Sequence, residues 1–203
     1  FWSFGPYVVR HIDEAQQVPW QYLFTRGIVI FIILNLFLYL EEGKDFFYNY
    51  KKIGISGLIG GVGLGIAMIS FIYSITNTSA AVTLLCLAAM PFITALLGFM
   101  FLKEEISINV WVAISIATVG IIIMAIDNTS NNTVIGLVFG LLSSVGFAVF
   151  STTLRWKKET PKFTTVSVAG LFCCLFSGIM IVYNDLSFLS TGKNHALFAT
   201  HGT

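Results

Sequence analysis

Charged residues are scarce in this chain of 203 residues. Asp, Glu, Lys and Arg make up 10% of it, whereas hydrophobic residues make up 56%. Soluble domains usually carry about 25% charged residues. The chain therefore has too few charges to cover a soluble domain of its length, and an ordinary soluble enzyme is excluded. We also expect no nucleic-acid partner.

Chemically reactive side chains are few as well. The three cysteines lie inside apolar runs, where they act as small apolar fillers and not as a disulfide framework; they are Cys86, Cys173 and Cys174. The three histidines have no metal-ligand spacing with them. No apolar run contains Asp, Glu or His in its interior, so an intramembrane enzyme would lack its acid, base or activated nucleophile. We expect no enzyme activity, no metal and no cofactor.

Long uncharged runs, in contrast, are abundant. Roughly 20 apolar residues span a bilayer as a helix. Six runs of about that length cover residues 19–40, 53–75, 79–102, 108–126, 134–154 and 163–183. Residues 1–9, "FWSFGPYVV", are typical of the last part of a further span. The sequence therefore predicts an all-α polytopic membrane protein whose surroundings are a lipid bilayer.

The stretch "GLIGGVGLG" at residues 57–65 superficially matches a phosphate-binding loop. It lies inside an uncharged run, without the strand, turn and Lys-Ser/Thr pair that such a loop requires. Gly57, Gly61 and Gly65 instead recur every four residues and so share one helix face. This doubled small-xxx-small pattern favours close helix–helix contact in lipid. The alternatives left open are pure packing and a helix that must slide or line a narrow path.

The distribution of Lys and Arg predicts the orientation. Three alternate loops, at residues 41–52, 103–107 and 155–162, hold eight of the eleven basic residues. The other set of loops, at 10–18, 76–78, 127–133 and after 183, holds Arg10 and Lys193. The excess of positive charge predicts that the first set is cytoplasmic.

Two regions of the chain share the same order of features: an apolar run, a short polar loop, a proline and a span. "FWSFGPYVVR" runs into a short polar loop, then Pro19 and a span, and "VGFAVFSTTLR" runs into a short polar loop, then Pro161 and a span. The two units start five spans apart, and an odd number of spans inverts the second copy. Inverted repeats are typical of secondary transporters. From the incomplete first run and the polar tail, we expect a fragment of a larger membrane protein.

The chain resembles the drug/metabolite transporter superfamily, specifically its EamA-type members. The resemblance is strongest over residues 73–124, where a small-residue turn precedes an apolar run with a Pro in mid-helix, then Leu-x-Glu, a short loop and a Gly-bearing span. The matching positions are Asn77, Ser79, Ala80, Pro91, Leu102, Glu104 and Gly120. Arg26 matches an arginine common in the second span of that family.

This resemblance implies ten spans built as two inverted five-helix repeats, of which the chain would hold the end of span 1 through span 7. Residues 1–126 would be the first repeat, truncated at its N-terminus, and residues 134–203 the start of the second. It further implies a multi-pass transporter in a bacterial inner membrane. We expect a secondary transporter that exports amino acids or related neutral or anionic metabolites by alternating access.

Four residues are candidates for substrate binding: Arg26, Tyr73, Ser143 and Ser144. Arg26 is the only charged residue within a complete run, and its guanidinium needs a partner such as a substrate carboxylate or phosphate, unless it snorkels to the interface. Tyr73 and the two serines are candidates for a cavity lining, although polar groups in spans more often bond neighbouring helices.

Two further residues are candidates for conformational roles. Pro91 removes a backbone hydrogen bond in mid-span, and the alternatives are a packing kink and a gating hinge. Glu104 is either solvated or paired with a cytoplasmic lysine in a gate. The rival to the transporter hypothesis is a non-transporting assembly or sensor subunit, and a homodimer is left open.

Overall fold

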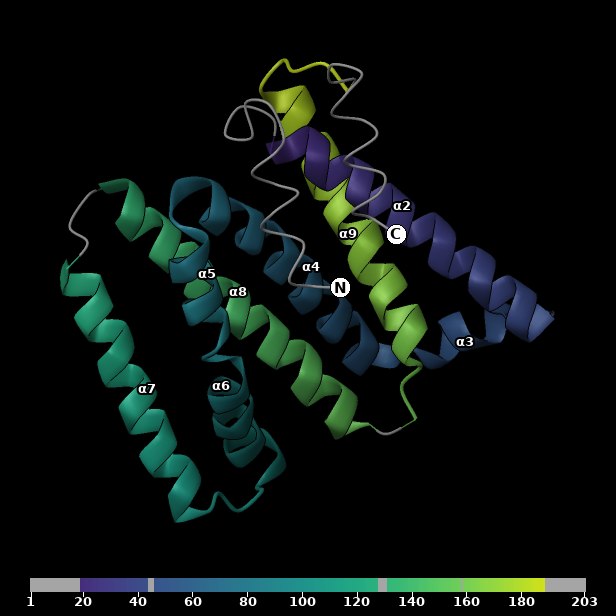
Figure 1. Cartoon of the computed structure of the whole chain (residues 1–203). Coiled ribbons are helices and arrows are strands. Elements are labelled where there is room, and N and C mark those ends of the chain that lie inside the picture. The colour runs from purple at the N-terminus through teal and green to yellow at the C-terminus, as the bar shows by residue number, and fades with distance from the viewer. Residues whose placement is uncertain (1–18, 44–45, 128–130, 158, 189–203) are drawn as a thin grey trace.

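The computed structural model describes residues 19–43, 46–127, 131–157 and 159–188, and every regular element in those ranges is a helix. They are α2 Pro19–Glu42, α3 Phe46–Lys52, α4 Gly54–Asn77, α5 Ala80–Leu87, α6 Met90–Leu97, the π-helical turn η3 Gly98–Leu102, α7 Ile108–Asp127, α8 Asn131–Trp156 and α9 Lys162–Tyr183 (Figure 1). The all-α fold class is confirmed. The partial span expected at residues 1–9, the loop at 10–18 and the tail beyond 188 lie outside the described residues.

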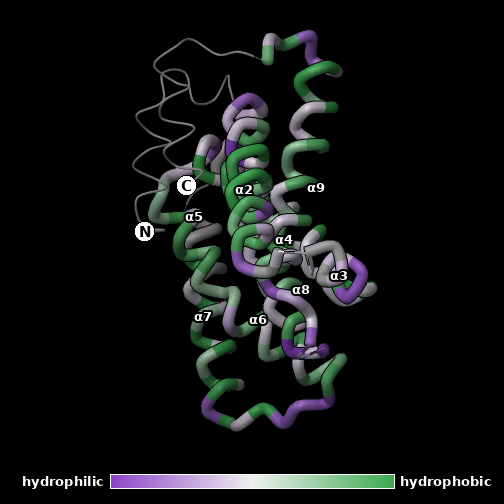
Figure 2. The backbone as a smooth tube through the Cα atoms, turned by 90° about the vertical axis from the view of Figure 1, so that its right-hand side faces the viewer, coloured by the Kyte–Doolittle hydropathy of each residue, from purple (hydrophilic) through white to green (hydrophobic). Residues whose placement is uncertain are grey.

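Five of the expected spans are helices that are long and apolar enough to cross a membrane, namely Pro19–Glu41, Gly54–Asn77, Ala80–Leu102, Val134–Trp156 and Lys162–Tyr183. The run expected at 108–126 is α7, in which Ile108–Gly120 forms a shorter apolar helix. Hydrophilic residues gather at α3 and at the turn between η3 and α7, whereas hydrophobic residues follow α7 and α9 (Figure 2). This distribution suits helices whose ends meet water and whose middles meet lipid.

The helix α4 is the centre of the described bundle, because it is packed on one side by α8 and on another by α9 (Figure 1). Its Leu64 and Ala67 are buried with Phe147 of α8 and Ala169 of α9. A second cluster joins the C-terminal half of α4, including Ile72, to α2 and α9. The helix α7 lies at the edge of the bundle, with most of its surface exposed.

Glycine faces allow α4 to approach both neighbours closely. A Cβ added at Gly61 would lie 2.7 Å from Val168 of α9 and 3.1 Å from the Thr165 carbonyl oxygen, and Gly57 and Gly65 also face α9. Gly63 instead faces α8, where its Cβ would lie 3.2 Å from the Gly146 carbonyl oxygen. The face containing Gly57, Gly61 and Gly65 is therefore one of two, and the sequence pattern alone did not indicate the second.

The helices α2 and α9 run antiparallel along a shared seam. Near the start of α2, Gln21 Nε2 donates to the Ser187 carbonyl oxygen just past the end of α9, at 2.7 Å. Near the end of α2, Asn35 Nδ2 donates to Ser167 Oγ near the start of α9, also at 2.7 Å. Between these contacts Gly27 and Gly170 oppose each other, and an added Cβ on either would lie within 3.2 Å of the other's carbonyl oxygen.

The three basic loops lie at one end of the bundle (Figure 1). Ser56 in the first turn of α4 bonds Thr160 in the α8–α9 loop, with the two hydroxyl oxygens 2.9 Å apart. Glu104 after η3 pairs with Arg155 at the end of α8. We call this end of the molecule the basic-loop end. Its assignment to the cytoplasm remains a prediction.

Candidate transport site

The side chain of Arg26, on α2, has one buried guanidinium nitrogen, Nε. Arg26 follows Tyr22 and Leu23 by one turn of α2, and these two residues are buried against α4 and against Cys173 of α9. Its Nε atom is buried and has no hydrogen-bond partner among the described residues. An arginine side chain remains protonated in proteins, and a buried charge is costly unless it is paired. A hydrogen-bond acceptor or an anion beside this Nε atom would offset the cost of burying it.

Tyr73 belongs to an aromatic cluster at the C-terminal half of α4. Its ring centroid lies 4.9 Å from that of Trp20 of α2 and 5.3 Å from that of Phe139 of α8. Trp20 in turn lies 5.9 Å from Phe176 of α9. The cluster thus joins four helices, and Tyr73 contributes ring surface to it.

The hydroxyls of Ser143 and Ser144 are used in helix–helix hydrogen bonds. Ser143 Oγ donates to the Ala67 carbonyl oxygen of α4 at 3.0 Å, and Ser144 Oγ lies 2.6 Å from the Cys86 carbonyl oxygen of α5. Both residues are fully buried. Because a hydroxyl has one proton, a ligand here could only donate to these oxygens. Tyr73 is six residues beyond Ala67, about 9 Å along α4. These contacts do not bring Tyr73, Ser143 and Ser144 into one site, so a shared binding site stays a proposal.

The third expected span is interrupted near Pro91. The chain leaves α5 after Leu87 and enters α6 at Met90, so Pro91 occupies the first turn of α6, where its missing N–H is not needed. The sequence predicted that Pro91 would remove a backbone hydrogen bond in mid-span, and the helix instead breaks just before that proline. The carbonyl oxygen of Cys86, at the break, accepts from the Ala89 N–H at 3.0 Å as well as from Ser144. Polar side chains often satisfy such freed backbone groups in lipid.

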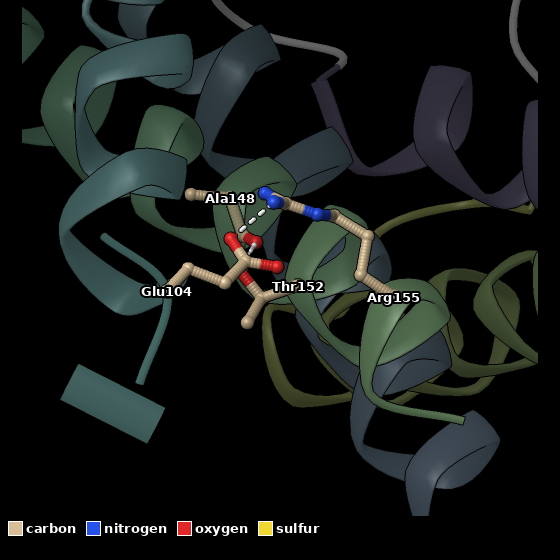
Figure 3. A network of polar contacts seen from close by, with 4 residues as sticks. All are labelled: Glu104, Ala148, Thr152 and Arg155. Carbon is tan, nitrogen blue, oxygen red and sulfur yellow. Dashed lines mark hydrogen bonds and ion pairs between the residues drawn. The ribbon is translucent and has the colours of Figure 1, made fainter. Parts of the chain in front are cut away.

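Glu104 and Arg155 form an ion pair that joins the end of η3 to the end of α8 (Figure 3). We call this pair the clasp. Lys103 takes a left-handed conformation with φ 55°, which turns the chain so that Glu104 N–H reaches the Gly98 carbonyl oxygen at 3.3 Å. A Cβ on Gly98 would lie 2.7 Å from Glu104 Oε2, so the absence of a side chain there makes room for the carboxylate. The partner of Glu104 is an arginine and not a lysine.

A pocket of about 300 Å³ opens beside the clasp. Its polar lining comes from Glu104, Glu105, Ser107 and Arg155, and Pro91 and Thr94 of α6 line it as well. The side chains of Arg155 and Glu104 are 45% and 38% exposed, so water screens the pair and its contribution to stability is small. Its geometry matters more, because it joins segments 51 residues apart at the basic-loop end.

The chain matches a known protein family over more than half of its length. The model of the EamA-like transporter family matches residues 1–126, which include α2 through α7. The chain belongs to the EamA-like transporter family. The resemblance to EamA-type members of the drug/metabolite transporter superfamily is therefore confirmed.

Two curated relatives of this EamA-like chain are each named "Uncharacterized transporter". They come from Helicobacter pylori strains J99 / ATCC 700824 and ATCC 700392 / 26695, and each is 26% identical to the chain over 177 residues. The aligned region covers 86% of this chain and 58% of each relative. The chain thus spans less than two thirds of the length of these relatives, and it is an integral membrane protein of a transporter family.

Sequence reasoning on this EamA-like chain missed three features of the site. The arginine that holds Glu104 was not singled out, although it stood in a loop already marked as basic. The sequence did not indicate that Gly98 makes room for the Glu104 carboxylate, since Gly98 resembles any other glycine within an apolar run. Asn35 is a polar side chain within an apolar run, but its partners, Ser167 and Tyr50, lie 132 and 15 residues away.

Proposed function

We propose that the chain forms part of a secondary transporter that exports small neutral or anionic metabolites, such as amino acids, by alternating access. The observation that carries the substrate class is the Arg26 guanidinium, whose buried Nε atom has no hydrogen-bond partner among the described residues. No apolar span of the chain supplies a carboxylate to offset it. A substrate carboxylate or phosphate would complete the site, whereas a cationic substrate would be repelled.

The test uses the full-length protein in lipid vesicles and a panel of labelled neutral, acidic and basic amino acids. Arg26→Ala should lower flux of the preferred substrate roughly tenfold or more, because hydrogen bonds to charged groups are among the stronger ones. Arg26→Lys keeps the charge but loses the planar fork, so it should be partly impaired. Thr25→Ala is the matched control, since that hydroxyl only bonds the Gln21 carbonyl oxygen of its own helix, at 3.0 Å.

Normal flux through a well-inserted Arg26→Ala variant would contradict a role of Arg26 in substrate binding. Its side chain would then only extend to the membrane–water interface. The absence of flux for every substrate in the panel would favour the assembly or sensor subunit instead. A preference for basic amino acids would contradict the proposed substrate class while leaving the transporter function intact.

We propose further that the two repeats, residues 1–126 and the repeat that begins at 134, are inverted copies that rock against each other. The antiparallel course of α2 and α9 supports this, because these are the second spans of the two copies and must point in opposite directions if the copies are inverted. Gly27 lies eight residues after Pro19 and Gly170 nine residues after Pro161, so the two spans cross at nearly equivalent positions.

The clasp is proposed as the inner gate. It links a span of the first repeat to a span of the second at the basic-loop end, and the neighbouring pocket reaches Pro91 at the break in the third expected span. Opening of the gate would exchange the ion pair for water, which costs little because both side chains are already partly exposed. The glycine face and Pro91 would then serve as the sliding surface and the hinge.

A further inference from the structure

Three polar side chains from three helices meet on the seam between α2 and α9. They are Asn35 of α2, Tyr50 of α3 and Ser167 of α9. Ser167 Oγ lies 2.7 Å from Asn35 Nδ2 and 2.8 Å from Tyr50 Oη, and Tyr50 Oη lies 2.7 Å from Asn35 Oδ1. Ser167 is fully buried. The three distances close a ring of hydrogen bonds.

The number of protons fixes the direction of this ring. Asn35 Oδ1 can only accept, so the single proton of the Tyr50 hydroxyl points to it. The proton between Tyr50 and Ser167 must then come from Ser167, which accepts in turn from the Asn35 amide. Each group donates once and accepts once around the ring, so the three bonds polarise and strengthen one another. Removal of either hydroxyl opens the whole ring.

The ring ties α3 to one span of each proposed repeat. α3 is a short helix of seven residues, and Gly54 with φ +57° turns the chain between it and α4. Its other tyrosine, Tyr48, is 56% exposed, and its ring is 4.8 Å from Lys52 Nζ. The two tyrosines of α3 therefore differ sharply: the Tyr50 hydroxyl enters the seam, and Tyr48 remains at the surface.

The ring sits close to the basic-loop end. Asn35 is seven residues from the end of α2 at Glu42, and Ser167 is five residues from the start of α9 at Lys162, about 10 and 8 Å along their helices. Deep in lipid, polar groups released from a ring would have no alternative partner. Near the interface, water can take the place of the phenol with nearly equal hydrogen bonds. The ring can therefore open and close reversibly.

We propose that α3 is a latch on the transporter: Tyr50 holds α2 and α9 together at the basic-loop end, and its withdrawal lets the two spans separate there. The proposal concerns the spacing of the seam and does not depend on the substrate. It is tested by a distance measurement without any substrate, so its failure would leave the proposed transport function standing.

The experiment places spin labels at Phe37→Cys of α2 and Phe163→Cys of α9, whose rings are 5.7 Å apart and whose side chains are both about half exposed. The full-length protein, with its other cysteines replaced by alanine, is reconstituted in lipid vesicles, and dipolar broadening reports the fraction of separated label pairs. Tyr50→Phe should raise the ratio of separated to close pairs roughly three- to tenfold, the effect of one lost hydrogen bond. Tyr48→Phe, on the same helix, should leave it unchanged.

Ser167→Ala provides the second variant. It removes the other hydroxyl of the ring together with the direct bond from Asn35, so the rise should equal or exceed that of Tyr50→Phe. An unchanged ratio in Tyr50→Phe, or an equal rise in Tyr48→Phe, would overturn the latch. If Tyr50→Phe fails to insert, Tyr50→Leu, which also lacks the phenol hydroxyl, takes its place: a wild-type ratio in that variant overturns the proposal, and a rise supports it.

Discussion

The contact between α4 and α8 at Gly63 and Gly146 provides a sharp test of the packing. A Cβ added at Gly146 would lie 2.5 Å from the Gly63 carbonyl oxygen and 2.9 Å from Ala67 Cβ. The carbonyl belongs to helical backbone, so it cannot turn aside as the end of a side chain can. Gly146→Ala must therefore push the two helices apart.

The size of the effect follows from this distance. Ordinary contact begins near 3.4 Å, so the helices must separate by about 0.9 Å at this point. A gap of about 0.5–1 Å already forfeits a quarter to a half of each contact energy along the seam. Because association in lipid depends on such packing, we expect Gly146→Ala to destabilise the protein by about 1–3 kcal/mol, the usual cost of overpacking.

The assay is thermal unfolding of the purified full-length protein in detergent. Gly120→Ala is the matched control, because a Cβ at this glycine of α7 would meet nothing within 4 Å. That variant should be neutral or stabilised by up to about 1 kcal/mol, since alanine is the better helix former. Equal unfolding temperatures for the two variants would refute the close contact between α4 and α8.

Three other expectations concern orientation, the glycine face and the clasp. Lys157→Cys, in a cysteine-free background, should resist an impermeant thiol reagent added outside the cell, and strong labelling would reverse the predicted orientation. Gly61→Leu should lower expression and thermal stability far more than Leu58→Val, whose side chain is 54% exposed, and equal behaviour would contradict the close-contact role. Gly98→Ala should displace the clasp carboxylate, with a stability change within about 0.5 kcal/mol, and should increase reagent access to a cysteine at Thr94 in the pocket. Unchanged access would count against the clasp as a gate.

The helices themselves could be predicted from the sequence because lipid imposes a strong and local rule. A long uncharged run must satisfy its own backbone, and a helix does so within one segment. The run at 53–75 accordingly became α4 Gly54–Asn77, and the run at 163–183 became α9 Lys162–Tyr183. The marked difference lies at the third run, where hydropathy continues without change across the break between α5 and α6.

The contacts between helices could not be predicted with the same certainty, because they join residues far apart in the sequence. Glu104 could have paired with any of several basic residues in the loops, and only the turn at Lys103 directs it to Arg155. The glycine face toward α9 was visible as a four-residue repeat. The face toward α8 was not, since Gly63 contacts Gly146 through a pairing that no single helix displays.

The contacts between the proposed repeats are of two kinds, and their positions have a mechanical consequence. In mid-membrane, Gly27 opposes Gly170 and Gly63 opposes Gly146, backbone against backbone. Such contacts depend on distance more than on direction, and the hydrogen bonds of Ser143 and Ser144 to carbonyl oxygens of α4 and α5 lie beside them. At the basic-loop end the contacts are directional: the clasp, the ring at Tyr50, and the pair of Ser56 with Thr160. A rocking motion about the glycines would separate these three distant polar links more than the hydrogen bonds of Ser143 and Ser144 beside the pivot, so the links at the basic-loop end would contribute most to the energy difference between its closed and open forms.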